Sequence, residues 1–258
     1  MDSRTRRLTS RSGAAFFLLA GIVLILSMTG CATVGKMPSA NSEPALKSAD
    51  SGRAWWYARF QMNWSQREED EPAWHNDLLI AHKVIAPVLE WFGKDIDLWR
   101  FHRRAAPDDG GHQFSFIFYS SPATAKKIYT AIQASALLEE MQKAGVILRV
   151  LYDDPDKPTR PLIESTSDPH WSEPLQRAWP WFIMGVSETW LDLISQYAEE
   201  REQTRKPATP AEFEEFYLEI NKKVDATWNR EGGHAFLHHL DALFGYRPVS
   251  IGKQQIRF

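Results

Sequence analysis

Two histidines and an aspartate near the C-terminus have the residue types and spacing of a metal site. In the segment GGHAFLHHLDALF, His234, His238 and Asp241 fall on one side of a predicted helix, opposite Phe236 and Leu240. Imidazole and carboxylate groups bind transition metals where they converge. No glutamate follows His234 as in the HExxH motif of metalloproteases. A solvent-exposed polar face explains the same pattern and is the interpretation we favour, so neither a metal nor a cofactor is predicted.

A second group of chemistry-bearing residues is cationic and lies on or beside predicted strands. Its members are Arg59, Arg100, His102, Arg103, His112 and Arg149. An arginine in the middle of a strand that is buried on both faces needs a carboxylate or an anion as its partner. Internal ion pairs are the default interpretation, and a pocket for an anionic ligand is the alternative. Arg59, Arg100, His102 and His112 are therefore ligand-binding candidates.

Tryptophans near the middle of the chain form a third group. Trp171, Trp179 and Trp181 occur in HWSEPLQRAWPWFIMG, and the chain has 11 tryptophans in all. Pro180 fits the first turn of a helix, so Trp179 and Trp181 are expected to flank a helix start. They could line a crevice between sheet and helices that stacks an aromatic ligand, or they could be core residues.

Two motifs of covalent catalysis and of phosphate binding are absent from the sequence. It contains no GxSxG elbow and no phosphate-binding glycine loop. A binding protein without catalytic activity is therefore our first hypothesis. An envelope hydrolase that uses histidine and carboxylate groups is the alternative.

The only cysteine follows a segment of the kind that directs export. Four arginines precede an apolar stretch from residue 14 to residue 26, and the small residues Thr29 and Gly30 stand before Cys31. A basic start, a short apolar core and a small-residue cleavage site are typical of a secretory signal peptide. The apolar stretch is shorter than the ~20 residues that cross a bilayer.

The segment Met28-Thr29-Gly30-Cys31 resembles the lipobox of bacterial lipoproteins. The resemblance implies that residues 1–30 are removed and that Cys31 becomes the lipid-carrying first residue of the mature chain. Several acyl chains would hold the protein stably on a membrane. Ala32, in place of an aspartate, implies the outer membrane of a Gram-negative host, with the protein facing the periplasm.

Composition restricts the partners of this mature chain. Removal of four arginines and one aspartate takes the formal net charge from −3 to −6 (30 − 4 basic against 33 − 1 acidic residues). An acidic protein has no global attraction to nucleic acid. With Cys31 acylated, no thiol remains for disulfides, metal binding or nucleophilic catalysis. The expected partners are the membrane, through the lipid, and an envelope protein or a small anionic or aromatic-stacking ligand.

Hydrophobic periodicity predicts an α+β fold. Residues 31–53 are small and polar and are expected to be a flexible tether. Residues 54–152 show the order βαββαβ, with strands near Trp55, Trp99, Phe116 and Leu148, which is the pattern of a ferredoxin-like unit. Residues 153–258 supply a proline-rich connector and C-terminal helices. The sheet is apolar on both faces, so these helices are expected to cover the second face.

Part of this unit is similar in sequence to an enzyme domain. The stretch LLIAHKVIAPVLEWFGKDIDLWRFHRR, followed by GHQFSFIFY, resembles the C-terminal elimination domain of lantibiotic and thiopeptide dehydratases, over residues 55–152. Those domains use arginines and a histidine on such a sheet to handle a glutamylated peptide. An exported protein has no access to glutamyl-tRNA, so the resemblance implies a shared scaffold rather than a shared reaction.

Overall fold

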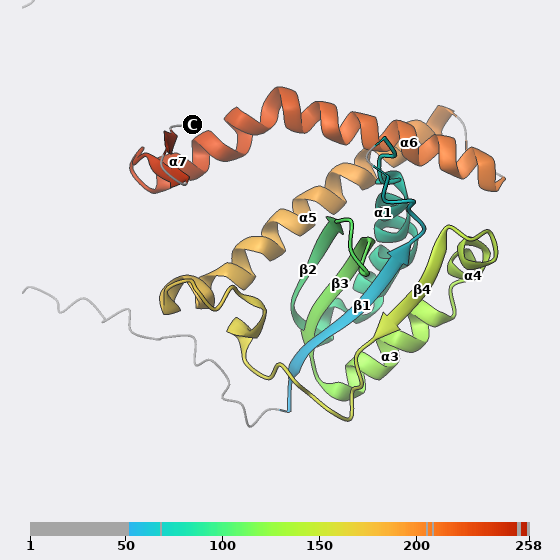
Figure 1. The fold of residues 1–258 in the computed structure, drawn as a ribbon, viewed down its shortest axis with the longest axis horizontal. Coiled ribbons are helices and arrows are strands. Elements are labelled where there is room, and N and C mark those ends of the chain that lie inside the picture. The colour runs from blue at the N-terminus through green and yellow to red at the C-terminus, as the bar shows by residue number, and fades with distance from the viewer. Residues whose placement is uncertain (1–51, 68, 205, 208, 252–253, 257–258) are drawn as a thin grey trace, which may run out of the picture. The chain divides into compact units, whose positions relative to one another are not determined.

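A computed structural model describes residues 52–256, apart from 68, 205, 208 and 252–253 (Figure 1). The predicted signal peptide, Cys31 and the tether as far as residue 51 lie outside the described residues. Arg53, at the start of the described chain, is held against the folded body. Its Nε lies 2.5 Å from Asp97 Oδ2, and its Nη2 donates to the carbonyl oxygen of Asp95 at 3.0 Å.

Four strands form one antiparallel sheet. They are β1 (Ala54–Met62), β2 (Ile96–Ala105), β3 (His112–Ser120) and β4 (Ile147–Tyr152), in the order β2-β3-β1-β4. All four were expected from the sequence. The sheet and its helices place the protein in the α+β class, as predicted. Its assignment to the ferredoxin-like fold stays a prediction.

The helix after β1 is interrupted where a proline interferes with its hydrogen bonding. It comprises α1 (His75–Ile80), the π-helical turn η2 (Ala81–Ile85), α2 (Ala86–Phe92) and the short η3 (Gly93–Asp95). Pro87 has no N–H and its ring crowds the carbonyl four residues earlier, which disfavours a regular α-helix at this point. The wider π turn ends at Ile85, two residues before the proline.

The segment after β3 contains two helices where one was expected. α3 (Pro122–Gln133) begins after the N-cap Ser121, whose Oγ accepts the N–H of Thr124 at 3.1 Å. A separate α4 (Ala136–Lys143) follows because Ser135 leaves the helical conformation and caps a new N-terminus. Gly145 ends α4 at φ +72°, a conformation that glycine adopts readily.

Most of the core lies on one face of the sheet, which we call the first face. Alternate residues of β1 and β3 point to it, and they include Trp56, Phe60 and Phe116. The helices α1 to α4 cover this face. So do Ile194 and Ala198 from the C-terminal half of α5 (Glu173–Thr204) and the buried side of α6 (Pro210–Thr227).

The opposite, second face is covered only in part by the predicted C-terminal layer. Its apolar residues, Trp55, Leu98, Ile117 and Tyr119, gather at one end of the sheet. They contact Met184 of α5 and the 3-10 turn η4 (Ile163–Thr166), where Trp55 Nε1 donates to the carbonyl oxygen of Ile163 at 2.8 Å. Most of the C-terminal helical contacts are on the first face instead. The rest of the second face carries polar and cationic residues, which a helical cover would bury.

The helix α5 runs along the edge strand β2 (Figure 1). Ser187 Oγ of α5 accepts the N–H of Phe101 in β2 at 3.1 Å. At the C-terminus, α6 continues into the π-helix η5 (Trp228–His238) and α7 (His239–Leu243). A short hairpin of β5 (Val249–Ile251) and β6 (Gln254–Ile256) follows.

Candidate functional site

Strand register brings cationic residues together on the second face of the sheet. Arg59 of β1 lies opposite Ser115 of β3, and Ser115 lies opposite His102 of β2. In the next row Ile117 separates Tyr57 from Arg100. Directly opposed residues of an antiparallel pair point to the same face. Three of the predicted ligand-binding candidates, Arg59, Arg100 and His102, therefore share one surface, which we call the cationic face.

One carboxylate serves two arginines beside this row. Arg59 Nη2 lies 3.4 Å from Asp153 Oδ1, and Arg160 forms a short ion pair with the other oxygen of Asp153. Both guanidinium groups also lie over the ring of Tyr57, at 4.4 and 4.2 Å from its centroid. Tyr57 therefore holds two cations against the sheet, and Asp153 balances only one of the two charges.

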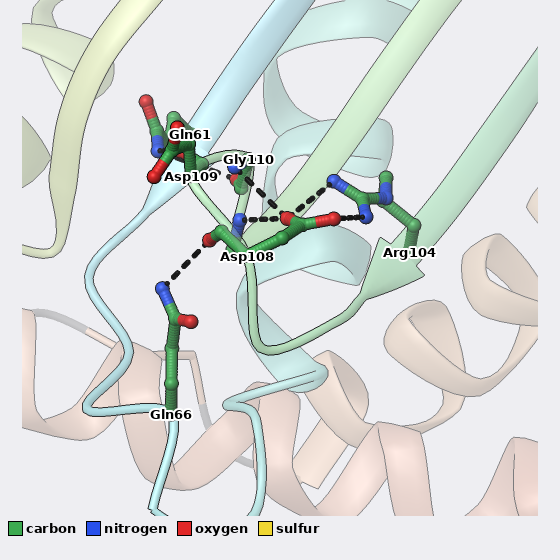
Figure 2. A network of polar contacts seen from close by, with 7 residues as sticks. Gln61, Gln66, Arg104, Asp108, Asp109 and Gly110 are labelled. Atoms are coloured by element: carbon green, nitrogen blue, oxygen red, sulfur yellow. Dashed lines mark hydrogen bonds and ion pairs between the residues drawn. The ribbon is translucent and has the colours of Figure 1, made fainter.

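The β2–β3 hairpin follows the next row of the sheet, which contains Gln61 and Arg104. Figure 2 shows the polar contacts of this hairpin. Asp108 accepts from Arg104 Nη2 at 2.5 Å and from the backbone N–H of Gly110 at 2.9 Å. The arginine also keeps the pKa of Asp108 below its usual range. Gln61 Nε2 reaches the carbonyl oxygens of Asp109 and Gly110 at 3.2 and 3.3 Å. The guanidinium of Arg104 is thus engaged within the protein.

The absence of a side chain at Gly110 makes room for this arrangement. A Cβ at that position would lie 2.1 Å from Arg104 Nη1 and 3.1 Å from Asp108 Oδ1. Gly111 adopts φ +57°, which favours glycine for a separate reason. The two glycines therefore allow the loop to fold back on Arg104.

Arg100 differs from its neighbours because it has no partner. It makes no hydrogen bond or ion pair with any described residue, and its Nε is buried. Burial lowers its pKa, and the neighbouring Tyr57 acts weakly in the opposite direction. The pKa of His102 is also lowered, first by burial and then by Arg100 and Arg104. Two neighbouring groups of β2 therefore present positive charge or hydrogen-bond donors without an acid to balance them.

This arrangement is suited to holding an anion. A guanidinium offers paired donors that match a carboxylate or a phosphate. Ser115 lies in the row between Arg59 and His102 and adds a hydroxyl donor. In a catalytic triad a carboxylate orients the histidine. No described carboxylate does this for His102, so binding is the chemistry that the geometry favours.

His112, the fourth candidate, is not on the cationic face. It shares the parity of Phe114 and is fully buried on the first face. Its Nε2 lies 3.0 Å from Asp77 Oδ1 and 3.2 Å from Oδ2, and Arg103 Nε donates to Oδ2 at 2.8 Å. The guanidinium of Arg103 also lies over the rings of Trp74 and Trp190. Sequence reasoning missed Asp77, which joins His112 and Arg103 into an internal polar cluster.

The predicted helix start at Trp179 and Trp181 is wrong. α5 begins at Glu173, and Pro180 lies inside it. Pro180 cannot donate to the carbonyl oxygen of Gln176, four residues earlier, and the hydroxyl of Ser167 donates to that oxygen at 2.6 Å instead. This substitute hydrogen bond explains how the helix continues through a proline.

The two tryptophans also differ in their surroundings. Trp179 contacts the rings of Trp171 and Phe182, at centroid distances of 4.9 and 5.4 Å. Trp181 is 53% exposed and lies on another side of α5. Trp181 is therefore not a core residue, and the two side chains do not line one surface together.

The histidines of η5 lie side by side without forming a metal site. The rings of His234 and His238 are stacked with centroids 5.4 Å apart, and His239 lies at a similar distance from both. Asp241 is buried in α7. Among the described residues, no three histidine, cysteine or acidic side chains are arranged to hold a metal ion.

Two hollows lie at the turn between α5 and α6, away from these groups. One is lined by Arg201, Pro207, Glu212, Glu215 and Phe216, and the other by Glu199, Glu202, Gln203 and Lys206. Neither contains a residue of the cationic face. In the part of the chain that the structure describes, no helix has the length and apolar character needed to cross a bilayer.

Comparison with known proteins adds no assignment to this picture. No family model matches the chain, and neither a curated protein nor a solved structure matches it at a significant level.

Proposed function

We propose that the protein is a lipid-anchored envelope protein that binds a small anionic ligand on its cationic face. Arg100 and His102 would be the primary contacts, with Arg59 and Ser115 beside them. The membrane anchor follows from the lipobox-like segment at Cys31. The ligand site follows from the register of β1, β2 and β3. Binding without chemistry is the simplest role for this set of groups.

The unpartnered guanidinium of Arg100 is the observation that carries the proposal. Taking a charged group out of water is costly unless it is paired or hydrogen-bonded. The other arginines of the second face have partners: Arg59 pairs with Asp153, Arg104 with Asp108, and Arg149 Nε donates to Gln61 at 2.6 Å. An anion bound at Arg100 would supply the missing acceptor.

The spacing of the groups indicates the class of ligand. Neighbouring strands lie ~4.8 Å apart, so Arg59 and His102, two strands apart, are ~10 Å apart at their backbones. A carboxylate or phosphate group can contact Arg100 and His102 together, because these residues are two apart on one strand. Tyr57 offers an aromatic edge to the rest of such a molecule. The expected ligand is therefore a small organic carboxylate or phosphate ester.

The test compares Arg100→Gln with the matched control Arg177→Gln, an exposed arginine on α5. Calorimetric titration with inorganic phosphate and with citrate should show binding to the wild type and to the control. Arg100→Gln should bind at least ~10-fold more weakly, since a charged hydrogen bond of ~1.5–3 kcal/mol is lost. Circular dichroism verifies that both variants fold. Equal binding by all three proteins, or no binding of either anion by the wild type, would overturn the ligand site.

The anchor is tested separately. Intact mass of the protein purified from membranes should show acylated Cys31 at the mature N-terminus, and Cys31→Ser should leave the membrane fraction. An unacylated mature N-terminus contradicts the anchor and leaves the ligand site untouched.

One observation favours a hydrolase as a second candidate. Ser115 lies directly opposite His102, and the lowered pKa of His102 favours the neutral form that a general base requires. In this case the wild type would hydrolyse an anionic ester such as p-nitrophenyl phosphate. Ser115→Ala would abolish turnover and retain binding of phosphate. A wild type that binds phosphate and shows no turnover rejects this alternative.

A further inference from the structure

The N-terminal half of α5 carries an apolar surface that is largely exposed, apart from the contact of Trp179 with Trp171. Leu175, Trp179, Phe182 and Val186 recur at spacings of four, three and four residues, so they share one side of the helix. Phe182 and Val186 are 45% and 46% exposed. The buried side of this half of α5 is a different side of the helix and carries Pro180, Met184 and Ser187. We call these four residues the α5 stripe.

A second uncovered apolar surface lies beyond α6. The helical path from α6 through η5 to α7 is continuous, and η5 and α7 mainly contact α6 and each other (Figure 1). This C-terminal extension exposes Trp228, Phe236, Leu243 and Phe244, with Leu243 84% and Phe244 70% exposed. Gly232 permits the wide π turn, since a Cβ there would lie 2.8 Å from the Trp228 ring. Among the described residues, the extension therefore presents large apolar side chains with no core around them.

The combined area of the two surfaces fits a dimer. Seven of the eight side chains are 39–84% exposed and contribute roughly 100 Å² each, and the less exposed Trp179 adds a smaller area, so together they offer roughly 700–800 Å² per chain. Each partner of a standard protein interface contributes a similar area.

Both surfaces lie along helical segments. The α5 stripe extends over 11 residue steps of α-helix, which is ~17 Å. The exposed residues of the extension lie on η5, on α7 and directly after α7. Two helical segments packed side by side could bring these surfaces into contact. Since the surfaces differ, each copy could offer its extension to the stripe of the other, and two such contacts would close a two-fold pair.

We propose that a second copy of this chain is the partner of both surfaces. In the dimer, the C-terminal extension of each copy packs on the α5 stripe of the other. The contact is therefore made twice, and association ends at two copies. Neither the lipid anchor nor the anionic ligand takes part in it.

Sedimentation of the full chain in detergent tests the proposal. The wild type should be dimeric at about 10 μM, as expected for a Kd near or below ~1 μM. Phe182→Asp removes a central contact that occurs twice. At ~30-fold for each contact, the homodimer should weaken about 1,000-fold. The matched control is Trp181→Asp, which changes an exposed aromatic on another side of the same helix and should leave the dimer intact.

A mixing experiment distinguishes this exchange from other pairings. Phe182→Asp and Phe244→Asp should each be monomeric at about 10 μM. In a mixture, one contact joins the intact extension of the first variant to the intact stripe of the second. A mixed dimer should therefore form, about 30-fold weaker than the wild type. Circular dichroism of each variant excludes misfolding as the cause of dissociation.

Three results would overturn the proposal. The first is a wild type that stays monomeric at about 10 μM. Binding of such a monomer to phosphatidylglycerol vesicles through Phe182 would assign the surface to a membrane instead of a second copy. The second is a dimer that both Asp variants retain. The third is a mixture of the two variants that remains entirely monomeric, which would show that like surfaces pair with like.

Discussion

Asp77 is the residue whose removal should be most informative about stability. Its carboxylate is fully buried in the first turn of α1 and accepts from Arg103 and His112. In Asp77→Asn the shape is retained and the charge is lost. The partly buried guanidinium of Arg103 and the fully buried imidazole of His112 then lack their anionic acceptor.

The expected loss can be worked out from these contacts. Removing one partner of a buried ion pair typically lowers the free energy of unfolding by ~3–5 kcal/mol. Arg103 keeps its contacts with the rings of Trp74 and Trp190, which places this variant at the lower end of that range, at about 3 kcal/mol. For a domain of this size the melting temperature should fall by about 6–12 °C. A loss of this size is a large part of the usual 5–15 kcal/mol of folding stability.

Urea unfolding followed by tryptophan fluorescence measures the effect. The control is Asp156→Asn, which breaks an exposed 2.7 Å pair with Lys126 and should cost ~0–1 kcal/mol. A double-mutant cycle with Arg103→Gln should give a coupling energy above ~1 kcal/mol. If Asp77→Asn stays within about 1 kcal/mol of the wild type, or if the cycle is additive, the reasoning about the buried cluster is refuted.

Three further predictions concern single side chains. Burial, with Lys83 nearby, lowers the pKa of His82 to about 4, so the native state resists a proton that the unfolded chain accepts near 6.5. The free energy of unfolding should therefore fall by ~1–3 kcal/mol as the pH drops from about 6.5 to 4. Unfolding measured on His82→Gln over the same pH range should not show this loss. Trp56→Ala should cost ~3–5 kcal/mol because its side chain is buried, whereas Trp181→Ala should cost under ~1 kcal/mol, and equal melting temperatures would contradict both assignments. A bound anion raises the lowered pKa of His102, so phosphate titrations should show affinity increasing as the pH falls, and a pH-independent wild type would exclude His102 from the site.

The regular elements of the sheet could be predicted because their side chains alternate. Trp56, Phe60 and Phe116 repeat at a period of two, and this pattern depends only on which face each residue buries. The interruptions could not be predicted in the same way. Ser135 can continue a helix or cap a new one, and the outcome depends on where the preceding helix meets the sheet. Pro180 is tolerated within α5 only because Ser167, distant in sequence, supplies a hydrogen bond.

The cationic face could be predicted in part for a similar reason. Parity alone places Arg100 and His102 on one face and separates them from His112, which shares the parity of Phe114. The pairing of Arg59 with Asp153 required knowledge of how the chain returns after β4. The lack of a partner for Arg100 could not be seen from the sequence, because it depends on the position of every carboxylate in the folded protein.

The hydrogen bond from Phe101 to Ser187 has a consequence for self-assembly. A four-stranded open sheet has two outer edges, and unpaired backbone groups on an edge invite another strand to add. α5 lies against the β2 edge and engages one of its amides, whereas β4 forms the other edge with no described strand beyond it. Growth of the sheet by strand addition is therefore restricted to the β4 side. A chain cut before Glu173 would uncover the β2 edge as well and could extend in both directions, so α5 protects the protein against polymerisation in addition to completing its core.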